Sequence, residues 1–349
     1  MKRDLKHFIL RTLVATLPII AFIGMYAALD PFKVIHRYDE MGCDSVSLGG
    51  NRGFESVKSL ERNLAQGRHY DSFIFGSSMS QAYKAEYWQP HLPAGASIFH
   101  FDASEETIDG IIDKIEYLNH RGIKITNALI IIEEEMLHRL PNDQSFLFAR
   151  PSETSSDVSW LQFQMQFFNT YKNIDFVCYS IAPRLWQETM LKKDLLSTDK
   201  ILHVDSINEV THASADSLIA VNPEAFFTEK RLKHNSIPML PRNQQVAIDS
   251  NVETKVARLA QLLKAGGKHY EVIVIPRLNR NYLMQWDLTI LQEYLGIEHV
   301  HDMTRHPLSN NPLAYYDQPA HMICTRCKEI LDEALAPTVI FPQNGSNGK

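Results

Sequence analysis

The feature that most constrains this chain is an uncharged apolar stretch close to its N-terminus. Residues 12–29, TLVATLPIIAFIGMYAAL, are 18 amino acids without a charged side chain. A helix of roughly 17–25 mostly apolar residues is long enough to cross the hydrocarbon core of a bilayer. The sequence therefore predicts a single membrane anchor within residues 1–30, with the remainder of the chain outside the bilayer.

The charges before this stretch predict its orientation. The first eleven residues carry four Lys and Arg side chains against one acid. Because positively charged flanks stay on the cytoplasmic side, we expect a single-pass protein whose main domain is exported to the periplasmic or extracellular side. Two other interpretations stay open: a cleaved signal peptide, for which Tyr26-Ala27-Ala28 is a poor cleavage site, and a buried core helix.

The composition is that of an ordinary globular protein. Of the 349 residues 44% are hydrophobic and 22% charged, which excludes a disordered or disulfide-dense chain. The net charge is -6 and no basic run is present, so we expect no nucleic-acid partner. Four cysteines fit an oxidising compartment. Two of them, Cys324 and Cys327, form a CxxC on a helical apolar stripe, which favours buried or paired cysteines over a redox centre.

Short apolar runs alternate with helical patterns along the rest of the chain. Four runs have the character of buried strands, and a fifth is shorter: SFIFG at 72–76, SIFHF at 97–101, ALIII at 128–132, EVIVI at 271–275 and residues 298–301. Apolar spacing of three and four predicts helices at 108–118, 256–263 and 282–294. Residues 176–181 fit either a strand or a helix, and 141–158 are rich in turn formers.

Alternating strands and helices build a parallel sheet with helices on both faces. We therefore expect one α/β domain over residues 31–338, followed by a disordered tail at 339–349. In such sheets the chemistry lies at the carboxyl ends of the strands. The residues directly after the predicted strands are thus the first place to look for a site.

A serine-rich turn follows the first predicted strand. It reads Gly76-Ser77-Ser78-Met79-Ser80. A tight turn between a strand and a helix exposes a side chain at the edge of the sheet and directs backbone N–H groups to one point. A serine there can attack an acyl carbonyl if a histidine accepts its proton. The alternative is a serine that only caps the helix.

An acid and a histidine stand near the other end of the chain. The segment Tyr315-Tyr316-Asp317-Gln318-Pro319-Ala320-His321 precedes a predicted terminal helix. An aspartate that orients a histidine forms the base half of a serine triad. The chain thus offers Ser78, Asp317 and His321 as candidate catalytic residues.

These segments resemble a known family. FIFGSSMSQAY is similar to the first block of SGNH (GDSL-like) hydrolases, in the variant with Gly-Ser-Ser in place of Gly-Asp-Ser, and YYDQPAHM is similar to their last block. The anchor, DPFKVI and EVIVIP resemble the membrane-anchored branch, which includes the teichoic-acid D-alanyl transfer protein and the alginate O-acetylation proteins. The resemblance implies a three-layer α/β/α flavodoxin-like fold.

The resemblance also implies roles for residues. Ser78 would be the nucleophile, His321 the general base and Asp317 its orienting acid. The Ser78 N–H would bind the oxyanion together with Ala103 or Ser104, which follow the second strand. The Asn of the family's third block is absent, and Glu133 stands after the third strand instead.

The implied function is acyl transfer through an acyl-serine, as an esterase or O-acyltransferase acting on cell-envelope polysaccharide. The resemblance implies a membrane-embedded partner that transports acyl groups, and no cofactor. The alternative is a catalytically inactive scaffold or binding protein in polysaccharide assembly.

A third class is a metal-dependent hydrolase. It would use one of two sets of ligands: His299, His301, Asp302 and His306, or His321, Cys324 and Cys327 with Asp317 as a fourth. No complete metal motif is present, so no metal is predicted. No glycine-rich nucleotide loop is present either.

The three consecutive acids Glu133, Glu134 and Glu135 follow the third strand. We expect at least one of them to point into the cleft and two to be solvated.

Overall fold

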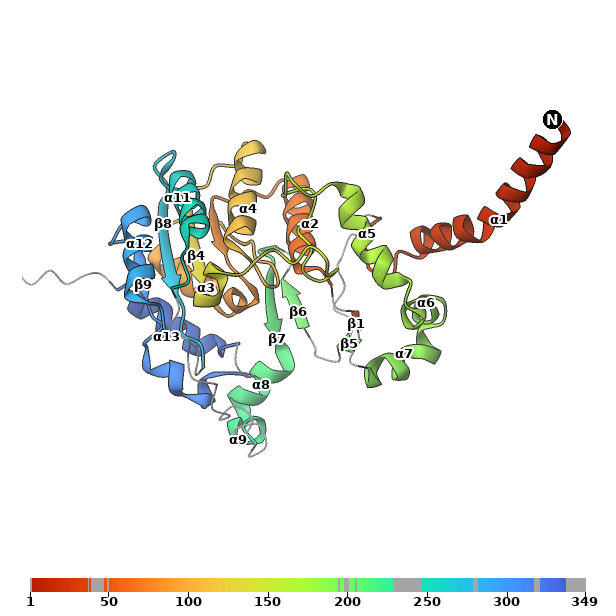
Figure 1. Ribbon diagram of the computed structural model, residues 1–349. Coiled ribbons are helices and arrows are strands. Elements are labelled where there is room, and N and C mark those ends of the chain that lie inside the picture. Colours follow the sequence, from red (N-terminus) through yellow and green to blue (C-terminus); the bar gives the residue numbers. More distant parts are fainter. Residues whose placement is uncertain are drawn as a thin grey trace, which may run out of the picture.

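The protein is an α/β structure with one long helix that stands away from the body (Figure 1). The computed structural model describes residues 2–36, 38, 47–48, 50–193, 195–197, 201–204, 206–228, 246–278, 282–316 and 321–336. The predictions about Asp317 and about the tail at 339–349 lie outside the described residues, as does Cys43, one of the four cysteines.

The body is organised around a parallel sheet of five strands in the order β3-β2-β4-β8-β9. The strands are β2 (Ser72–Phe75), β3 (Ile98–His100), β4 (Asn127–Ile132), β8 (His269–Val274) and β9 (Val300–Asp302), and each pairing is parallel. All five predicted strands are confirmed. Numbered along the chain, the order is 2-1-3-4-5, a doubly wound order whose switch point lies between β2 and β4.

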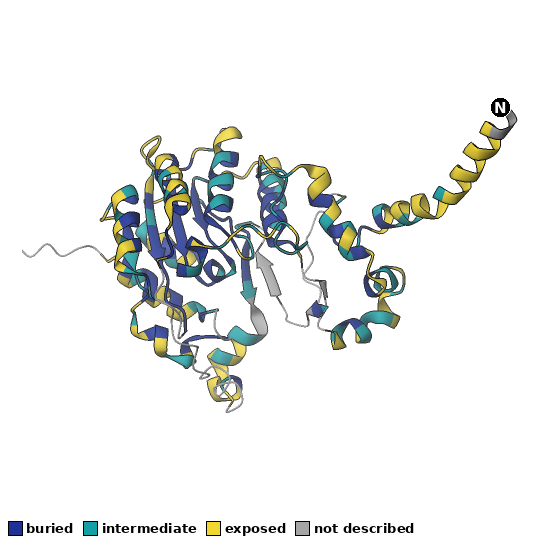
Figure 2. Cartoon of the chain, viewed as in Figure 1, coloured by how far each residue is buried: buried dark blue, intermediate teal, exposed yellow. Residues whose placement is uncertain are grey.

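Helices cover both faces of this sheet, because successive strand residues point alternately into two cores. Phe73 and Phe75 belong to one core and Ile74 to the other. The first core is closed by α2 (Arg52–Ala65), α4 (Ile108–His120), α11 (Ser250–Lys264) and α12 (Gln285–Leu295). The second is closed by α3 (Ala85–Trp88) and α13 (Cys324–Ala334). Figure 2 shows the buried strands between exposed helix faces.

A separate group of helices lies beside the sheet, where the long helix leaves the body (Figure 1). It consists of α5 (Trp160–Tyr171), α6 (Ile174–Ile181) and α7 (Pro183–Lys192), which share an aromatic core of their own. Residues 176–181, which fitted either a strand or a helix, thus belong to a helix. Residues 141–158 form neither helix nor strand, as predicted.

Smaller elements complete the described chain. Two antiparallel pairs are β1 (Ser47–Leu48) with β5 (Leu196–Ser197) and β6 (Ile201–Val204) with β7 (Glu209–His212). Two helices follow the second pair, α8 (Ala213–Val221) and α9 (Pro223–Phe226). Short 3-10 helices are η1 (Ser78–Ala82), η2 (Gln89–His91), η3 (Glu134–Leu137), η4 (Pro307–Asn310) and η5 (Pro312–Ala314).

The long helix is α1 (Lys2–Leu29). Its segment Leu5–Leu29 is 25 residues long and apolar enough to span a membrane, and none of its most apolar window is buried in the protein. A core helix would be buried, so that alternative is wrong. The prediction that the main domain is exported stays a prediction, as does the alternative of a cleaved signal.

Candidate active site

Two of the predicted site residues meet at the carboxyl edge of the sheet. The Ser78 Oγ lies 3.0 Å from the His321 Nε2, although the residues are 243 positions apart in sequence. Both side chains are half-buried. A hydroxyl within hydrogen-bond distance of an imidazole is placed to give up its proton to that ring. The third predicted residue, Asp317, lies outside the described residues.

Gly76 allows the serine turn to lie against the neighbouring strand. A Cβ at this position would come within 2.8 Å of the Ile131 carbonyl oxygen and 2.7 Å of the Ser80 Cβ. Real Cβ atoms do not approach backbone oxygen so closely, so a larger residue would push the turn away from β4. The glycine thus sets the position from which Ser78 reaches His321.

Ser77 fixes the turn from within. Its hydroxyl accepts a hydrogen bond from the Met79 N–H at 3.2 Å, as the cap of η1, and donates one to Glu133 Oε2 at 3.0 Å. The other Glu133 oxygen lies 3.0 Å from Arg139 Nη1. The capping role considered for the serines therefore falls to Ser77, and the Ser78 side chain is left to bond His321.

The three acids after β4 are less solvated than expected. Glu133 is 0% and Glu134 7% exposed, so the expectation of two solvated acids is wrong for this pair. The 3-10 helix η3 begins one residue after β4 ends, so these acids lie within a compact turn and not on an extended strand end. Glu133 is compensated by Arg139 and Glu135 by Arg277, and burial raises the pKa of Glu134. Glu133 supports the serine turn through its hydrogen bond with Ser77.

A buried ion pair supports η1 from the opposite side. Asp102, directly after β3 and 0% exposed, receives hydrogen bonds from Arg52 Nε at 2.9 Å and Arg52 Nη2 at 2.7 Å. Its Oδ2 also accepts from Gln81 Nε2 at 2.8 Å, within η1. Burial alone raises the pKa of Asp102, but the charge of Arg52 and these hydrogen bonds bring it down to about 2. The Asp102 carboxylate therefore stays ionised and is bonded to η1 through Gln81.

A second serine–histidine contact lies entirely inside the protein. Ser80 Oγ donates to the Ser77 carbonyl oxygen at 2.7 Å and lies 3.0 Å from His100 Nε2. Burial lowers the pKa of His100 to about 3, so the ring is neutral near pH 7. Because the Ser80 hydroxyl is 0% exposed, this pair stabilises the turn and offers no accessible nucleophile.

His321 is held by a short antiparallel bridge. The Tyr316 N–H donates to the His321 carbonyl oxygen at 2.8 Å, and Tyr315 pairs with Met322. The Ile323 N–H donates to the Ala314 carbonyl oxygen at 2.8 Å, just before α13 begins. The two ends of the segment that contains Asp317 are therefore close together. That segment is the one the sequence marked as the base half of the triad.

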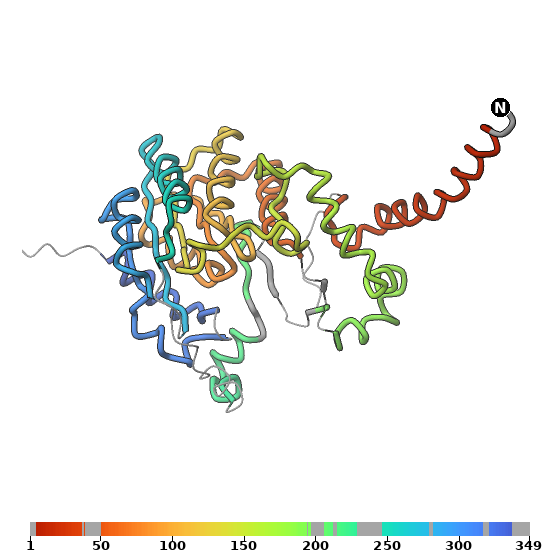
Figure 3. The backbone as a smooth tube through the Cα atoms, in the orientation of Figure 1, coloured from red at the N-terminus to blue at the C-terminus, as the bar shows by residue number. Residues whose placement is uncertain are grey.

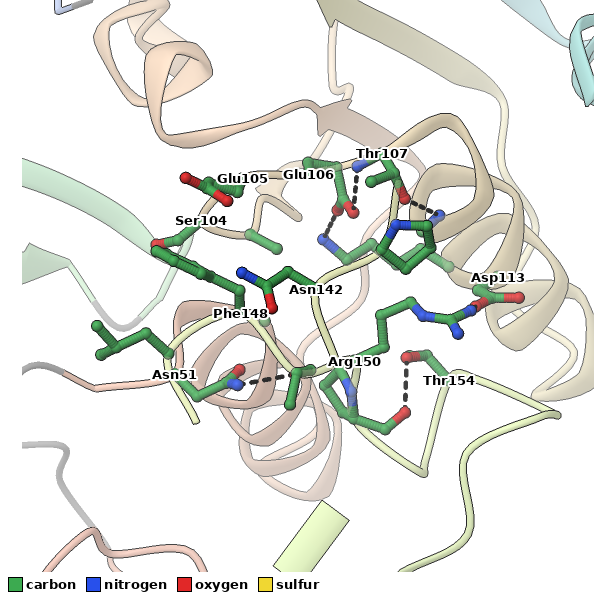
Figure 4. A pocket seen from close by; sticks show the side chains of 18 residues that line it. Asn51, Ser104, Glu105, Glu106, Thr107, Asp113, Asn142, Phe148, Arg150 and Thr154 are labelled. Carbon is green, nitrogen blue, oxygen red and sulfur yellow. Dashed lines mark hydrogen bonds and ion pairs between the residues drawn. The ribbon is translucent and has the colours of Figure 1, made fainter. Parts of the chain in front are cut away.

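The loop after β3 is closed by hydrogen bonds. The Ala103 N–H donates to the Gly76 carbonyl oxygen at 3.2 Å, so this predicted oxyanion donor is already engaged. Glu106 pairs with Lys114 at 2.5 Å, and Glu105 has a φ of +51°, which is uncommon for a residue with a side chain. Figure 4 shows the small cavity where Ser104 and this loop face the loop of Arg150. Ser104, the other predicted donor, lines that cavity.

A larger cavity of about 290 Å³ lies beside the two segments that carry Ser78 and His321. Lys84 and Tyr87, which follow the serine turn, line one part of it, and Ile323 and Cys324, which follow the histidine, line another. The Tyr316 hydroxyl, at the base of the histidine bridge, bonds Asp216, a further residue of the lining.

The metal-compatible groups are not assembled within the described part of the chain. His301 Nε2 lies 2.8 Å from Glu271 Oε2, far along the sheet from the serine turn in the strand order. Cys324 and Cys327 are free thiols on α13, and burial raises the pKa of both. Cys327 is 0% exposed, which confirms the packing role predicted for that cysteine. No set of three or more His, Cys, Asp or Glu side chains among the described residues is arranged to hold a metal ion.

The fold and the site together define a class: an α/β protein whose parallel sheet places a hydrogen-bonded serine and histidine at its carboxyl edge, next to the switch point. Comparisons with known protein families and with curated proteins found no match for this chain.

Proposed function

We propose that this protein is a membrane-anchored serine esterase or O-acyltransferase of the SGNH-like, three-layer α/β/α type. The observation that carries the proposal is the 3.0 Å contact between Ser78 Oγ and His321 Nε2 at the edge of a sheet with order 2-1-3-4-5. Four independent supports hold the serine turn against the sheet, and a nucleophile needs such preorganisation.

The proposed chemistry has two halves. The Ser78 Oγ attacks an ester carbonyl, its proton passes to His321 Nε2, and the leaving alcohol takes that proton as the ester C–O bond breaks. The acyl group is now bonded to Ser78. Water or an acceptor hydroxyl then gives a proton to His321 and attacks the acyl carbonyl. The bond between the acyl group and Ser78 Oγ breaks as His321 returns that proton to Ser78, which releases an acid or a new ester. Asp317 is proposed to hold the imidazole in the required tautomer.

The substrate is proposed to be a cell-envelope polysaccharide, with the main domain on the exported side of the membrane. The apolar helix α1 supports a location at the membrane. The cavity lined by Lys84, Tyr87 and Cys324, which follow the serine and histidine in sequence, is proposed to receive part of the sugar or acyl group. A membrane-embedded partner would supply acyl groups if the reaction is a transfer. These points rest on the resemblance of the two end motifs.

A second candidate function is an inactive scaffold or binding protein with the same fold. The observation that favours it is the Ala103 N–H, which is bonded to Gly76 and so does not point to a developing oxyanion. An acyl-transfer enzyme normally needs more than one such donor, and losing one costs about 10²–10³ in rate.

A fluorophosphonate probe distinguishes the two candidates. The full chain, purified in detergent, is incubated with the probe, which phosphonylates an activated serine and loses fluoride. We expect labelling that maps to the Ser78 peptide and disappears in Ser78→Ala and His321→Ala. Absence of labelling on folded wild-type protein would overturn the acyl-serine proposal and leave the scaffold.

Ser80→Ala is the matched control. It removes a serine from the same turn, but one that is buried and bonded to His100. We expect this variant to keep the label on Ser78. A thermal unfolding curve for each variant shows that any loss of labelling occurs in folded protein.

A further inference from the structure

The junction between α1 and the body is fixed by a buried turn. The Asp30 carboxylate accepts hydrogen bonds from the backbone N–H groups of Val34 at 2.9 Å, Ile35 at 3.0 Å and His36 at 2.8 Å. Asp30 itself is 2% exposed. A carboxylate that gathers three amides directly after a helix holds the exit of the chain in one conformation. The direction in which α1 leaves the body is therefore set.

Aromatic contacts join α1 to α5 before the apolar segment has ended. The Phe22 ring is 5.8 Å from the Phe168 ring and 5.4 Å from the Tyr171 ring, and Tyr26 contacts the same two rings. Phe22 lies about 26 Å along the helix from Leu5, at 1.5 Å per residue. The hydrocarbon core is about 30 Å thick. If α1 spans the bilayer from Leu5, α5 touches it at the depth of the lipid boundary.

Large apolar side chains are exposed on the three helices around this junction. On α5, Leu161 is 63% and Met165 41% exposed, and they continue the stripe of Phe168 at helical spacing. On α6 and α7, the exposed apolar residues are Ile174 at 65%, Ile181 at 60% and Leu185 at 82%. We call these five residues the anchor-side apolar surface. The five residues lie on three consecutive helices beside the junction with α1, and several large exposed apolar side chains on neighbouring helices mark an interaction surface.

Positive charges border this surface. Lys172 follows α5, Arg184 lies in the first turn of α7, Lys192 is its last residue and Lys193 follows it, all of them exposed. Lys192 pairs with Glu188 and Lys193 with Asp175, so four bases and two acids leave residues 160–193 with a net charge of +2. Trp160, at the start of α5, is 60% exposed. It lines a cavity together with Lys33 and His36, which follow the end of α1. Apolar side chains flanked by Lys and Arg, with a tryptophan nearby, have the composition of helices that lie in the bilayer interface.

We propose that the anchor-side apolar surface of α5–α7 rests on the bilayer, so that the body lies against the membrane and does not hang freely from α1. The occupant is the lipid surface, because the surface continues directly from the contact between α1 and α5 and its border is basic. The inference goes beyond the proposed chemistry and holds for either side of the membrane.

Two exposed tryptophans at opposite ends of the body provide the test. Trp160 lies in the α5–α7 group, and Trp286, 61% exposed, lies on α12 at the far end of the molecule (Figure 3). The full chain is reconstituted in nanodiscs with or without lipids brominated near the carbonyl end of the acyl chains, which quench only tryptophans at that depth. Trp186, half-buried on α7 in the same group, is replaced in every protein. The proteins compared are Trp186→Phe alone, Trp186→Phe with Trp160→Phe, and Trp186→Phe with Trp286→Phe.

In the Trp186→Phe background, we expect brominated lipid to quench the parent and the Trp286→Phe variant, and to quench the Trp160→Phe variant far less. Equal quenching of the two variants would show that the body does not touch the lipid through α5, and would overturn the proposal. A dimer in the nanodisc whose Trp160 is not quenched would also overturn the proposal, because a second copy of the chain would then cover the anchor-side apolar surface. Ile181→Glu with Leu185→Glu should reduce Trp160 quenching in protein that stays in the disc. None of these readouts depends on Ser78, so failure here is separable from failure of the acyl-serine proposal.

Discussion

The turn that carries Ser78 and the antiparallel bridge beside His321 meet at one hydrogen bond, yet they are held in different ways. The serine turn is fixed by the close approach at Gly76, by the Ser77–Glu133 bond, by the Asp102–Arg52 pair and by Ser80 with His100. The histidine is held by a short backbone bridge before α13. Damage to the serine side should therefore reduce folding stability, whereas damage to the histidine side should mainly reduce probe labelling of Ser78.

The largest expected effect comes from Arg52→Met. It leaves the Asp102 carboxylate buried without its charge partner, and breaking a buried pair costs about 3–5 kcal/mol. Denaturant unfolding of the full chain in detergent measures the loss. The double variant Arg52→Met with Asp102→Leu should recover part of that stability. If the double variant were no more stable than the single one, the pair would not be the support inferred for the serine turn.

Gly76→Ala should come next, with a loss of about 1–3 kcal/mol, because the added Cβ would overlap the Ile131 carbonyl oxygen and force the turn away from β4. Probe labelling of Ser78 should fall with it. Gly122→Ala is the control, since no atom lies within 4 Å of its added Cβ. Its backbone, at a φ of +71°, is also strained, but it should keep its labelling. Equal labelling losses in the two variants would contradict the role of Gly76.

The pH dependence of stability tests the buried His100. Its folded pKa is about 3 against an ordinary 6.5, so between these values the unfolded chain binds a proton that the folded chain does not. Stability should therefore fall as the pH falls from about 6.5 to about 3, by up to about 1.4 kcal/mol per pH unit. The comparison is wild type against His100→Gln, which should lack this slope.

The difference between the two proteins is the quantity to measure. Burial raises the pKa of Asp113 to about 6, so its protonation increases stability as the pH falls towards 4, opposite to the effect of His100. This contribution of Asp113 is the same in wild type and His100→Gln. Asp102 contributes only below its ordinary value of 3.8. Parallel curves for wild type and His100→Gln above pH 4 would mean that His100 is not held neutral by burial.

The smallest expected effect on stability is on the histidine side. Tyr316→Phe removes a hydroxyl that bonds Asp216 and lies 3.4 Å from Cys324 Sγ. Because this bond to a carboxylate is only part-buried, its loss should cost about 1.5 kcal/mol, at the lower end for hydrogen bonds to charged groups. Labelling of Ser78 by the probe should slow while the unfolding curve moves little. A stability loss larger than that of Gly76→Ala would reverse the contrast between the two halves of the site.

The sheet could be predicted from sequence because its strands are buried on both faces. Runs such as ALIII at 128–132 are continuous and apolar, which no surface element tolerates. The α5–α7 group could not be placed in the same way. In this group some apolar residues face the aromatic core and others are exposed. The apolar residues at 176–181 therefore follow neither the helical nor the strand period.

The meeting of Ser78 with His321 was predictable from the order of two motifs, whereas their supports were not. Arg52 and Asp102 are single charged residues whose pairing follows from the packing of α2 on the sheet edge, and no local pattern marks them. The acids after β4 were misjudged for the same reason. Their cation partners, Arg139 and Arg277, become neighbours only through η3 and the end of β8.

The 243 positions between Ser78 and His321 also have a consequence in time. A ribosome that has made β2 and β4 has produced Ser78 without its histidine partner. If the proposed chemistry holds, the Ser78 hydroxyl would stay an ordinary alcohol until His321 has emerged and the bridge between Tyr315 and Met322 has formed. A chain arrested or cleaved before that point would then be inactive, so the order of residues would confine reactivity to finished molecules.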